Sequence, residues 1–304
     1  MKILVADKLD DAAITTMREA GLDVTVKTGL SPEALVAEIP SYDVIAIRGA
    51  TKVTKEVISA AKNLKFIVRA GIGLDNVDQA AAKACGITVC NTPAATTISV
   101  AEHVFALLFA LVRHVPAAHA QLEQGIWEKT AFMGSELFEK TLGIIGFGRI
   151  GREVAKRALV FGMKIVAYDP LIALSVGTST GTPLISLDEL LKIADVVTLH
   201  LPLTAETKNL LDAQRIAQMK RGALMINCAR GGIVDELAVA TAVKNKNLGG
   251  AAFDVFAEEP LPKSSPLLGV PGILVTPHLG AQTHEGQRRA GMELADIVIE
   301  FKGR

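Results

Sequence analysis

The chain has 304 residues, half of them apolar and only 4% aromatic, so its length favours two domains or one large one, and its apolar content suits parallel sheets covered by helices. The 32 basic residues balance the 32 acidic ones, which argues against an overall attraction to nucleic acid or to an anionic membrane. Three cysteines without disulfide or metal-ligand spacing are explained most simply as small buried hydrophobes with free thiols, so we expect a cytoplasmic protein without a metal site.

Short β-branched segments alternate with helical patterns from the first residue, as in βαβ units. A helix is predicted near 10–20, and a second opens at Ser31 and Pro32, which suit the cap and the first turn. The strands lack clean polar alternation, so we expect both faces of their sheet to be covered. In this part of the chain strands are predicted at 2–7, 23–26, 43–48, 64–70 and 87–91.

Near residue 98 the pattern changes to a long, mostly apolar helix over 99–115, which follows a Pro-containing turn and predicts a domain crossing. A second βα series then runs to about residue 280, and residues 285–304 form one amphipathic helix. We therefore expect a first domain of 1–97 plus 283–304 and a second of 98–282. In the second series strands are predicted at 140–145, 164–169, 195–202, 223–228, 248–256 and 273–280.

The segment GIIGFGRIG places Gly146, Gly148 and Gly151 at G-x-G-x-x-G spacing between a strand and a helix. The spacing alone is weak evidence, because glycines also serve ordinary tight turns, but here strand, glycines and helix follow in order. The next strand ends on Asp169, near the offset of about 20 residues at which an acid accepts the ribose hydroxyls of NAD and repels the 2′-phosphate of NADP. The segment therefore predicts NAD as the cofactor.

Charged side chains follow three successive strands of the second series. Arg230 comes directly after one strand, Asp254 and Glu259 lie at and just after the end of the next, and His278 follows the last. Ligands of open α/β sheets bind outside the carboxyl ends of the strands, so we expect these side chains to converge. Taken singly, Arg230 also fits an ion pair with a helix terminus, and His278 a hydrogen-bonded core histidine. Spacing alone does not separate Glu259 from Glu258.

Several segments together resemble the D-2-hydroxyacid dehydrogenase family: the glycine segment, NCARGGIVDE, DVFAEEP and TPHLGAQT. IRGATKVT, VRAGIGLDNVD, NTP, AEH and FMGSEL are most similar to its D-3-phosphoglycerate dehydrogenase branch. The resemblance runs over essentially the whole chain. It implies two doubly wound α/β domains, Rossmann-like and flavodoxin-like, with a cleft between them that closes by a hinge.

The resemblance also implies a catalytic set of Arg230, Glu259 and His278, with Glu259 chosen because it directly precedes Pro260. His278 would take the proton of the C2 hydroxyl as hydride leaves C2, Glu259 would orient His278, and Arg230 would hold the substrate carboxylate in its planar fork. Around NAD the resemblance places Gly146, Gly148, Arg149, Ile150, Gly151, Asp169, Leu201, Pro202, Cys228, Ala229, Asp254, Gly280 and Ala281.

The first domain is expected to supply substrate contacts. Arg48 is interpreted as an anion-binding residue, although a surface ion pair is the alternative, and the backbone of Ala70, Gly71, Ile72 and Gly73 as a carboxylate or phosphate site. Ile72 stands where several relatives have a small hydroxyl residue near the nicotinamide, which puts one polar cofactor contact in doubt. Lys129 either reaches the substrate of a partner subunit or is a solvated lysine. Asn76 and Asp78 are expected only to cap the following helix.

The function expected from these features is NAD-dependent oxidation of D-3-phosphoglycerate to 3-phosphohydroxypyruvate, which leads to serine. The alternatives are a hydroxypyruvate or glyoxylate reductase, which needs no phosphate site, and a dinucleotide-sensing binding protein on the same fold. The family's dimers imply a homodimer, or a tetramer of such dimers, formed through the apolar helix and the arm that follows it, although a helix buried within the domain is the alternative. The 304 residues hold no C-terminal serine-binding domain, so we expect no serine inhibition through one.

Overall fold

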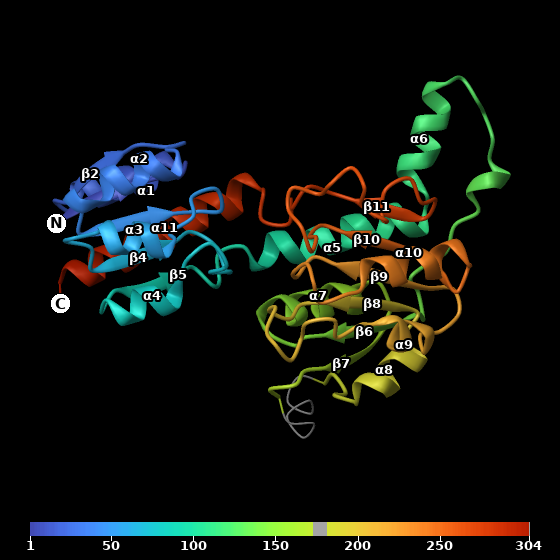
Figure 1. Ribbon diagram of the computed structural model, residues 1–304. Coiled ribbons are helices and arrows are strands. Elements are labelled where there is room, and N and C mark those ends of the chain that lie inside the picture. The colour runs from blue at the N-terminus through green and yellow to red at the C-terminus, as the bar shows by residue number, and fades with distance from the viewer. Residues whose placement is uncertain (173–180, 304) are drawn as a thin grey trace. The chain divides into compact units, whose positions relative to one another are not determined.

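The computed structural model describes residues 1–172 and 181–303 and divides the chain into two compact units. The first unit comprises residues 1–97 and 281–304, and the second comprises residues 98–280 (Figure 1). The sequence prediction placed the return to the first unit at residue 283, two residues later.

The first unit holds a five-stranded parallel sheet in the order β2-β1-β3-β4-β5, which is the flavodoxin-like doubly wound order. Each strand lies within one or two residues of its predicted position. The strands are β1 (Lys2–Val5), β2 (Asp23–Val26), β3 (Val44–Ile47), β4 (Phe66–Arg69) and β5 (Thr88–Asn91).

Alternate residues of these strands pack against opposite layers of helices, because successive side chains of a strand point to opposite faces. Ile3 packs in the core formed with α1 and α11, whereas Leu4 packs in the core formed with α2, α3 and α4. The C-terminal helix α11 therefore completes the core that the N-terminal strand begins. The helices are α1 (Asp11–Glu19), α2 (Pro32–Glu38), η1 (Ile39–Ser41), α3 (Lys55–Ala60), α4 (Gln79–Ala84) and α11 (His284–Lys302).

The second unit holds a six-stranded parallel sheet in the order β11-β10-β9-β8-β6-β7, and Leu184 makes a further bridge to Ala167 of β7. The order reverses between β6 and β8, which is where open α/β sheets bind ligands. The strands are β6 (Thr141–Ile145), β7 (Lys164–Tyr168), β8 (Val196–Leu199), β9 (Ala223–Asn227), β10 (Leu248–Phe253) and β11 (Ile273–Val275).

Helices also cover both faces of this sheet. One core is formed with α5 and α7, and the other with α8, α9 and α10. Two apolar cores on one parallel sheet explain why its strands lack polar alternation. The bounds are α5 (Thr97–Val112), α7 (Arg149–Val160), α8 (Leu187–Ile193), α9 (Ala213–Ala217) and α10 (Glu236–Lys244).

Three strands of this sheet end at least three residues earlier than the sequence predicted. β8 stops at Leu199 rather than 202. β10 stops at Phe253 rather than 256, and β11 stops at Val275 rather than 280. The backbone N–H groups of Leu279 and Gly280 bond to the Asp254 carboxylate, and not to a neighbouring strand. The charged residues that follow these strands are therefore in loops.

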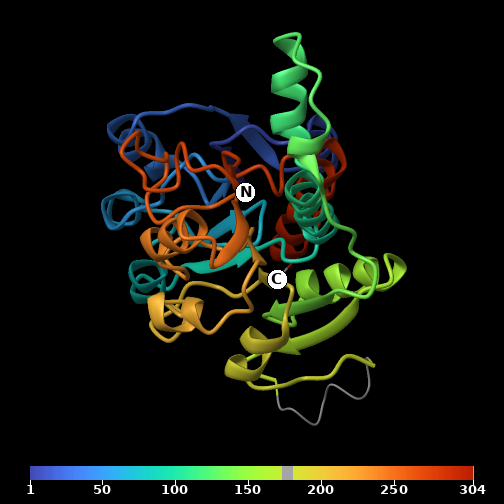
Figure 2. The same ribbon diagram turned by 90° about the vertical axis from the view of Figure 1, so that its right-hand side faces the viewer.

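The long helix predicted over 99–115 is two helices. α5 ends at Val112, and α6 (Val115–Glu123) begins after His114, whose φ of 53° is left-handed. Pro116 near the start of α6 explains the break, because a proline ring clashes with the carbonyl four residues before it. α6 buries none of its residues and projects from the rest of the second unit (Figures 1 and 2).

Among residues 1–172 and 181–303, no single helix is long and apolar enough to cross a bilayer. Only α5 and α6 taken together reach the required length and composition, and they do so across a 60° bend. Most of α5 lies buried in the core that it shares with α7.

Candidate active site

The glycine loop after β6 has the geometry that a bound pyrophosphate requires. Gly146 adopts a φ of 97°. A Cβ on Gly151 would lie 2.2 Å from the Gly146 carbonyl oxygen, so only glycine lets α7 approach the loop this closely. Gly148 is exposed, has no heavy atom within 4 Å of a Cβ position, and precedes α7 without a side-chain cap. The first turn of α7, with Arg149 and Ile150, therefore offers uncapped N–H groups to an anion.

Asp169 lies at the end of β7 and faces the same loop. Its Oδ2 accepts the N–H of Phe147 at 2.8 Å, and its Oδ1 accepts the N–H of Leu171 at 2.9 Å. Each carboxylate oxygen keeps a second lone pair, so the side chain can still accept a ribose hydroxyl. The open position at Gly148, the uncapped helix and this acid fit a dinucleotide.

Arg230 is positioned by the residue that ends β9. The buried Asn227 accepts the N–H of Ala229 through Oδ1 at 3.0 Å and donates through Nδ2 to the Arg230 carbonyl at 3.0 Å. The Arg230 guanidinium is part-buried and donates from Nη1 to the Ala229 carbonyl at 2.6 Å. A single amide thus fixes the loop that carries the arginine.

Gly231 brings this loop against the chain that follows β10. A Cβ at this position would lie 1.8 Å from the carbonyl oxygen of Phe256 and 2.5 Å from the backbone nitrogen of Ala257. Any side chain would push the two loops apart, so the close approach depends on glycine. The loop of Arg230 and the loop of Glu259 are therefore packed directly on each other.

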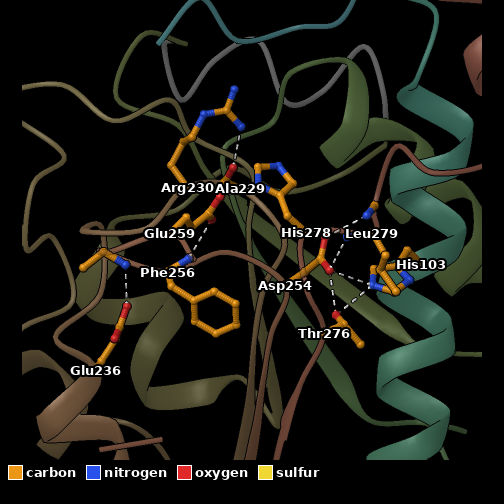
Figure 3. Close-up of polar contacts among 12 residues, drawn as sticks. His103, Ala229, Arg230, Glu236, Asp254, Phe256, Glu259, Thr276, His278 and Leu279 are labelled. Atoms are coloured by element: carbon orange, nitrogen blue, oxygen red, sulfur yellow. Dashed lines mark hydrogen bonds and ion pairs between the residues drawn. The ribbon is translucent and has the colours of Figure 1, made fainter. Parts of the chain in front are cut away.

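Glu259, and not Glu258, contacts His278. Its Oε2 lies 2.8 Å from His278 Nδ1, and its Oε1 accepts the Phe256 N–H at 3.0 Å, whereas Glu258 bonds to neither of these groups (Figure 3). Burial acts to raise the pKa of Glu259, but the His278 and Phe256 hydrogen bonds and the charges of His278 and Arg230 outweigh it and lower the pKa. Glu259 is therefore ionised at neutral pH and holds a proton on His278 Nδ1, which leaves Nε2 for chemistry.

The buried Asp254 holds the turn that follows His278. Its carboxylate accepts the Thr276 hydroxyl at 2.6 Å and the N–H groups of Leu279 and Gly280 at 2.7 Å each. His103 of α5 places its Nε2 3.2 Å from the same carboxylate (Figure 3). Burial acts to raise the pKa of Asp254, but these partners outweigh it and lower the pKa.

His103 was missed by the sequence reasoning, which used it only within the AEH segment. A histidine on a mostly apolar helix is an ordinary feature, and only the packing of α5 brings it to Asp254.

The backbone of His278 itself is left-handed, with a φ of 55°. A non-glycine residue in this region is costly, and the bonds to Asp254 on the next two N–H groups hold it there.

The remaining residues proposed around the cofactor lie at the same edge of this sheet, apart from Ala281, which is the first residue of the return to the first unit. Leu201 and Pro202 follow β8, and the Pro202 carbonyl is held by the Thr207 hydroxyl at 2.6 Å. Cys228 and Ala229 are buried after β9. Burial, with the nearby Asp254 charge, raises the pKa of Cys228 well above its ordinary value, so it remains a thiol.

Arg48 follows β3 in the first unit and is part-buried. Its N–H donates to Asp7 at 2.6 Å, and its Nη1 donates to the Lys8 carbonyl at 3.3 Å. Burial lowers the pKa of Arg48, and the charge of Asp7 acts in the opposite direction. Within the described residues its guanidinium bonds to a carbonyl and forms no ion pair, so the alternative of a surface ion pair is not observed there.

The segment 70–73 uses part of its backbone in the fold. The N–H of Ala70 donates to the Ile47 carbonyl at 2.8 Å, and the N–H of Gly71 donates to the Thr92 hydroxyl at 2.7 Å. Within the described residues no hydrogen bond is made by the N–H groups of Ile72 and Gly73. An anion at this segment would therefore bind to these two N–H groups.

Two further expectations concern Asn76 and Lys129. Asp78 caps α4 by accepting the Ala81 N–H at 2.9 Å, as predicted, but Asn76 does not cap it. Asn76 instead donates to the carbonyls of Arg48 and Thr51. Lys129 is exposed in the segment between α6 and β6. No group of three or more His, Cys, Asp or Glu side chains suited to a metal ion occurs in the described parts of the chain.

Known proteins resemble this chain along its full length. The D-3-phosphoglycerate dehydrogenase of Archaeoglobus fulgidus is 47% identical over 304 residues, which make up 100% of this chain and 58% of that protein. The chain thus spans little more than half the length of the curated relatives it matches. The crystal structure of a protein from Thermus thermophilus superposes with a TM-score of 0.91 at 38% identity, covering 100% of this chain and 98% of that one.

A D-lactate dehydrogenase of Aquifex aeolicus, solved with NAD and lactic acid, superposes with a TM-score of 0.87 at 29% identity, covering 100% of this chain and 96% of that one. Residues 105–280 match the NAD-binding domain of one family. They contain the glycine loop, Asp169, Arg230, Glu259 and His278. With more than half of its residues in this match, the chain belongs to the D-isomer specific 2-hydroxyacid dehydrogenase family and carries its NAD-binding domain.

Proposed function

We propose that the protein catalyses NAD-dependent oxidation of D-3-phosphoglycerate to 3-phosphohydroxypyruvate, the first step toward serine. The observation that carries the chemistry is the bond between Glu259 and His278 beside the loop of Arg230. The substrate is inferred from the relatives named D-3-phosphoglycerate dehydrogenase, which match 98–100% of the chain at 45–48% identity.

The proposed roles follow from the donors and acceptors at the site. NAD supplies the acceptor for the hydride that leaves C2. His278 uses Nε2 to take the proton of the C2 hydroxyl, and in the reverse direction it returns that proton to the oxo group. Glu259 keeps the other ring nitrogen protonated and stabilises the imidazolium. Arg230 binds the substrate carboxylate with two parallel N–H groups and polarises the neighbouring oxygen.

In the first unit we assign the substrate phosphate to Arg48 and a substrate anion to the N–H groups of Ile72 and Gly73. A guanidinium matches phosphate geometry, and successive N–H groups bind anions without a charged side chain. Asp169 favours NAD over NADP, because a carboxylate next to the ribose repels a 2′-phosphate.

We further propose that the protein acts in the cytoplasm as a homodimer. Its three cysteines form no disulfide within the described residues, which suits a reducing compartment. The arm over 113–140 carries exposed apolar side chains, among them Trp127 at 76% and Met133 at 81% exposure. A second copy would cover them, because exposed clusters of large apolar residues mark interfaces.

A substrate panel tests the proposed function. The loss of NADH absorbance is followed with 3-phosphohydroxypyruvate, hydroxypyruvate and glyoxylate at equal concentrations. We expect kcat/KM to favour the phosphorylated acid by about a hundredfold, since a hydrogen bond to a charged group contributes up to about 3 kcal/mol and about 1.4 kcal/mol corresponds to a factor of ten. Equal use of the unphosphorylated acids would identify a hydroxypyruvate or glyoxylate reductase, and binding of NAD without turnover would indicate a sensor.

A further inference from the structure

Polar side chains enclose the loop that follows β3 in the first unit. We call residues 48–51 (Arg-Gly-Ala-Thr) the Arg48 loop. It is bounded by Asp7, which lies two residues after β1, and by Asn76, which lies in the segment after β4. Both residues bind its backbone and both lie within one unit.

Asp7 holds the N–H groups of the loop. Its Oδ2 accepts the Arg48 N–H at 2.6 Å, and its Oδ1 and Oδ2 each lie 3.2 Å from the Thr51 nitrogen. Oδ1 also accepts the Thr51 hydroxyl at 2.7 Å. Asp7 is only 6% exposed, and a buried carboxylate is costly unless it is fully hydrogen-bonded. The loop supplies those bonds, so the carboxylate and the loop fix each other.

Asn76 holds the carbonyl groups of the same loop. Its Nδ2 donates to the Arg48 carbonyl at 2.8 Å and to the Thr51 carbonyl at 2.6 Å. Both partners are acceptors only, so the amide nitrogen and not the oxygen must face them. Its Oδ1 is buried and has no hydrogen-bond partner in the described part of the chain, which is unfavourable for a polar atom. The side chain is therefore used for its two donations alone.

Together these contacts fix Arg48 at both of its backbone polar groups. Asp7 takes its N–H, and Asn76 bonds to its carbonyl, which also accepts from Arg69 Nε at 2.9 Å. The guanidinium uses one of its five N–H donors within the described residues, toward the Lys8 carbonyl. An arginine fixed at its backbone loses less conformational freedom when it binds an anion.

We propose that Asp7 and Asn76 are positioning residues that hold Arg48 for the substrate phosphate, and thereby set the preference for phosphorylated over unphosphorylated 2-oxo acids. The inference deepens the proposed function and rests on it. Neither side chain is required to touch the substrate.

The test compares Asn76→Ala with a matched control, Asn63→Ala. Asn63 lies in the same unit and also donates from Nδ2 to a carbonyl, that of Pro40 at 2.9 Å, but away from the Arg48 loop. kcat/KM is measured for 3-phosphohydroxypyruvate and for hydroxypyruvate with one preparation of each protein. The ratio of the two values does not depend on the folded fraction, so partial unfolding cannot imitate the effect.

In Asn76→Ala we expect the ratio to fall by about tenfold or more, mainly through a higher KM for the phosphorylated acid. Loss of one hydrogen bond between Arg48 and the phosphate would cause a change of this size. Asn63→Ala should keep the wild-type ratio. If Asn76→Ala does not fold, Asp7→Asn is measured in its place, because it keeps the size of the side chain and turns one acceptor into a donor that faces the Arg48 N–H.

An unchanged ratio overturns the inference. This includes an equal loss of kcat/KM with both substrates, which would mark a purely structural role. A wild-type protein without preference for the phosphorylated acid overturns the proposed function, and the inference with it. The wild-type measurement therefore tells the two failures apart.

Discussion

The bond between Glu259 and His278 makes the stability of the fold depend on pH. The pKa of Glu259 is lowered in the fold by His278 and by the Phe256 N–H, against the opposing effect of burial. A carboxyl with a depressed pKa stabilises the fold above its ordinary pKa, and the stabilisation is lost as the pH falls through the lowered value. The pair is therefore intact at neutral pH and breaks in acid.

Glu259→Gln removes this charge and leaves the size of the side chain. We expect kcat to fall by at least about tenfold at neutral pH, because general acid–base catalysis contributes about 10²–10⁴. The unfolding midpoints of wild type and variant should differ at neutral pH and converge in acid. Glu258→Gln is the matched control, because the bonds to His278 and to the Phe256 N–H are made by Glu259, so the neighbouring substitution should change neither quantity. An equal effect of the two substitutions would contradict the assignment.

Arg230→Lys keeps the positive charge and removes the planar fork. We expect kcat/KM for the 2-oxo acid to fall by about a hundredfold, since a bidentate carboxylate pair needs two parallel donors, while the Kd of NADH stays unchanged. Steady-state kinetics and fluorescence titration measure the two effects. Arg221→Lys, at an exposed position of the same unit, serves as the control. Wild-type kinetics in Arg230→Lys would refute a role in carboxylate binding.

At the scale of elements, two nearby glycines at the junction of β6 and α7 have different roles: one serves ligand binding and the other serves packing. A Cβ on Gly148 would meet no heavy atom within 4 Å, whereas one on Gly151 would lie 2.2 Å from the Gly146 carbonyl oxygen. The φ of Gly148 is −76°, so an alanine there is not strained. One glycine leaves room for a ligand, and the other lets the helix touch the strand.

Gly148→Ala should therefore keep the free energy of unfolding within about 0.5 kcal/mol of wild type and raise the KM for NAD, because its methyl group would enter the phosphate space. Gly151→Ala should lower the free energy of unfolding by about 1–3 kcal/mol, the usual cost of overpacking. Denaturant unfolding and NAD kinetics distinguish the two. A Gly148→Ala protein with unchanged KM for NAD would exclude close approach of the cofactor at this residue.

At the scale of the whole molecule, the arm over 113–140 carries several of the exposed large apolar side chains of the second unit. If a second copy covers it, the double substitution Trp127→Asp and Met133→Asp should convert a dimer to monomers, since two charges cannot be buried unpaired. Sedimentation equilibrium measures the mass. Leu237→Asp is the control, because Leu237 is also a large exposed apolar residue of this unit but lies on α10. A dimer that survives the double substitution would exclude the arm as its interface.

The sequence by itself predicted the alternation of strands and helices, the glycine loop with Asp169, and the three strand ends that carry Arg230, Glu259 and His278. These features are local, because residue spacing and chain direction are enough to place a side chain at the carboxyl edge of a parallel sheet. The sheet order confirms that these strands are neighbours. Pro116 is also a local signal for the break between α5 and α6, but the long apolar pattern led to the prediction of a single helix.

Only the tertiary structure decided which residues meet across the chain. Spacing did not separate Glu258 from Glu259, whereas the fold bonds Glu259 to His278. Asn76 was expected to cap a helix but donates to two carbonyls of the Arg48 loop. His103 was not singled out until α5 packed it against Asp254. Such contacts join residues distant in sequence, and their partners depend on how the elements pack, which no local pattern of residue types contains.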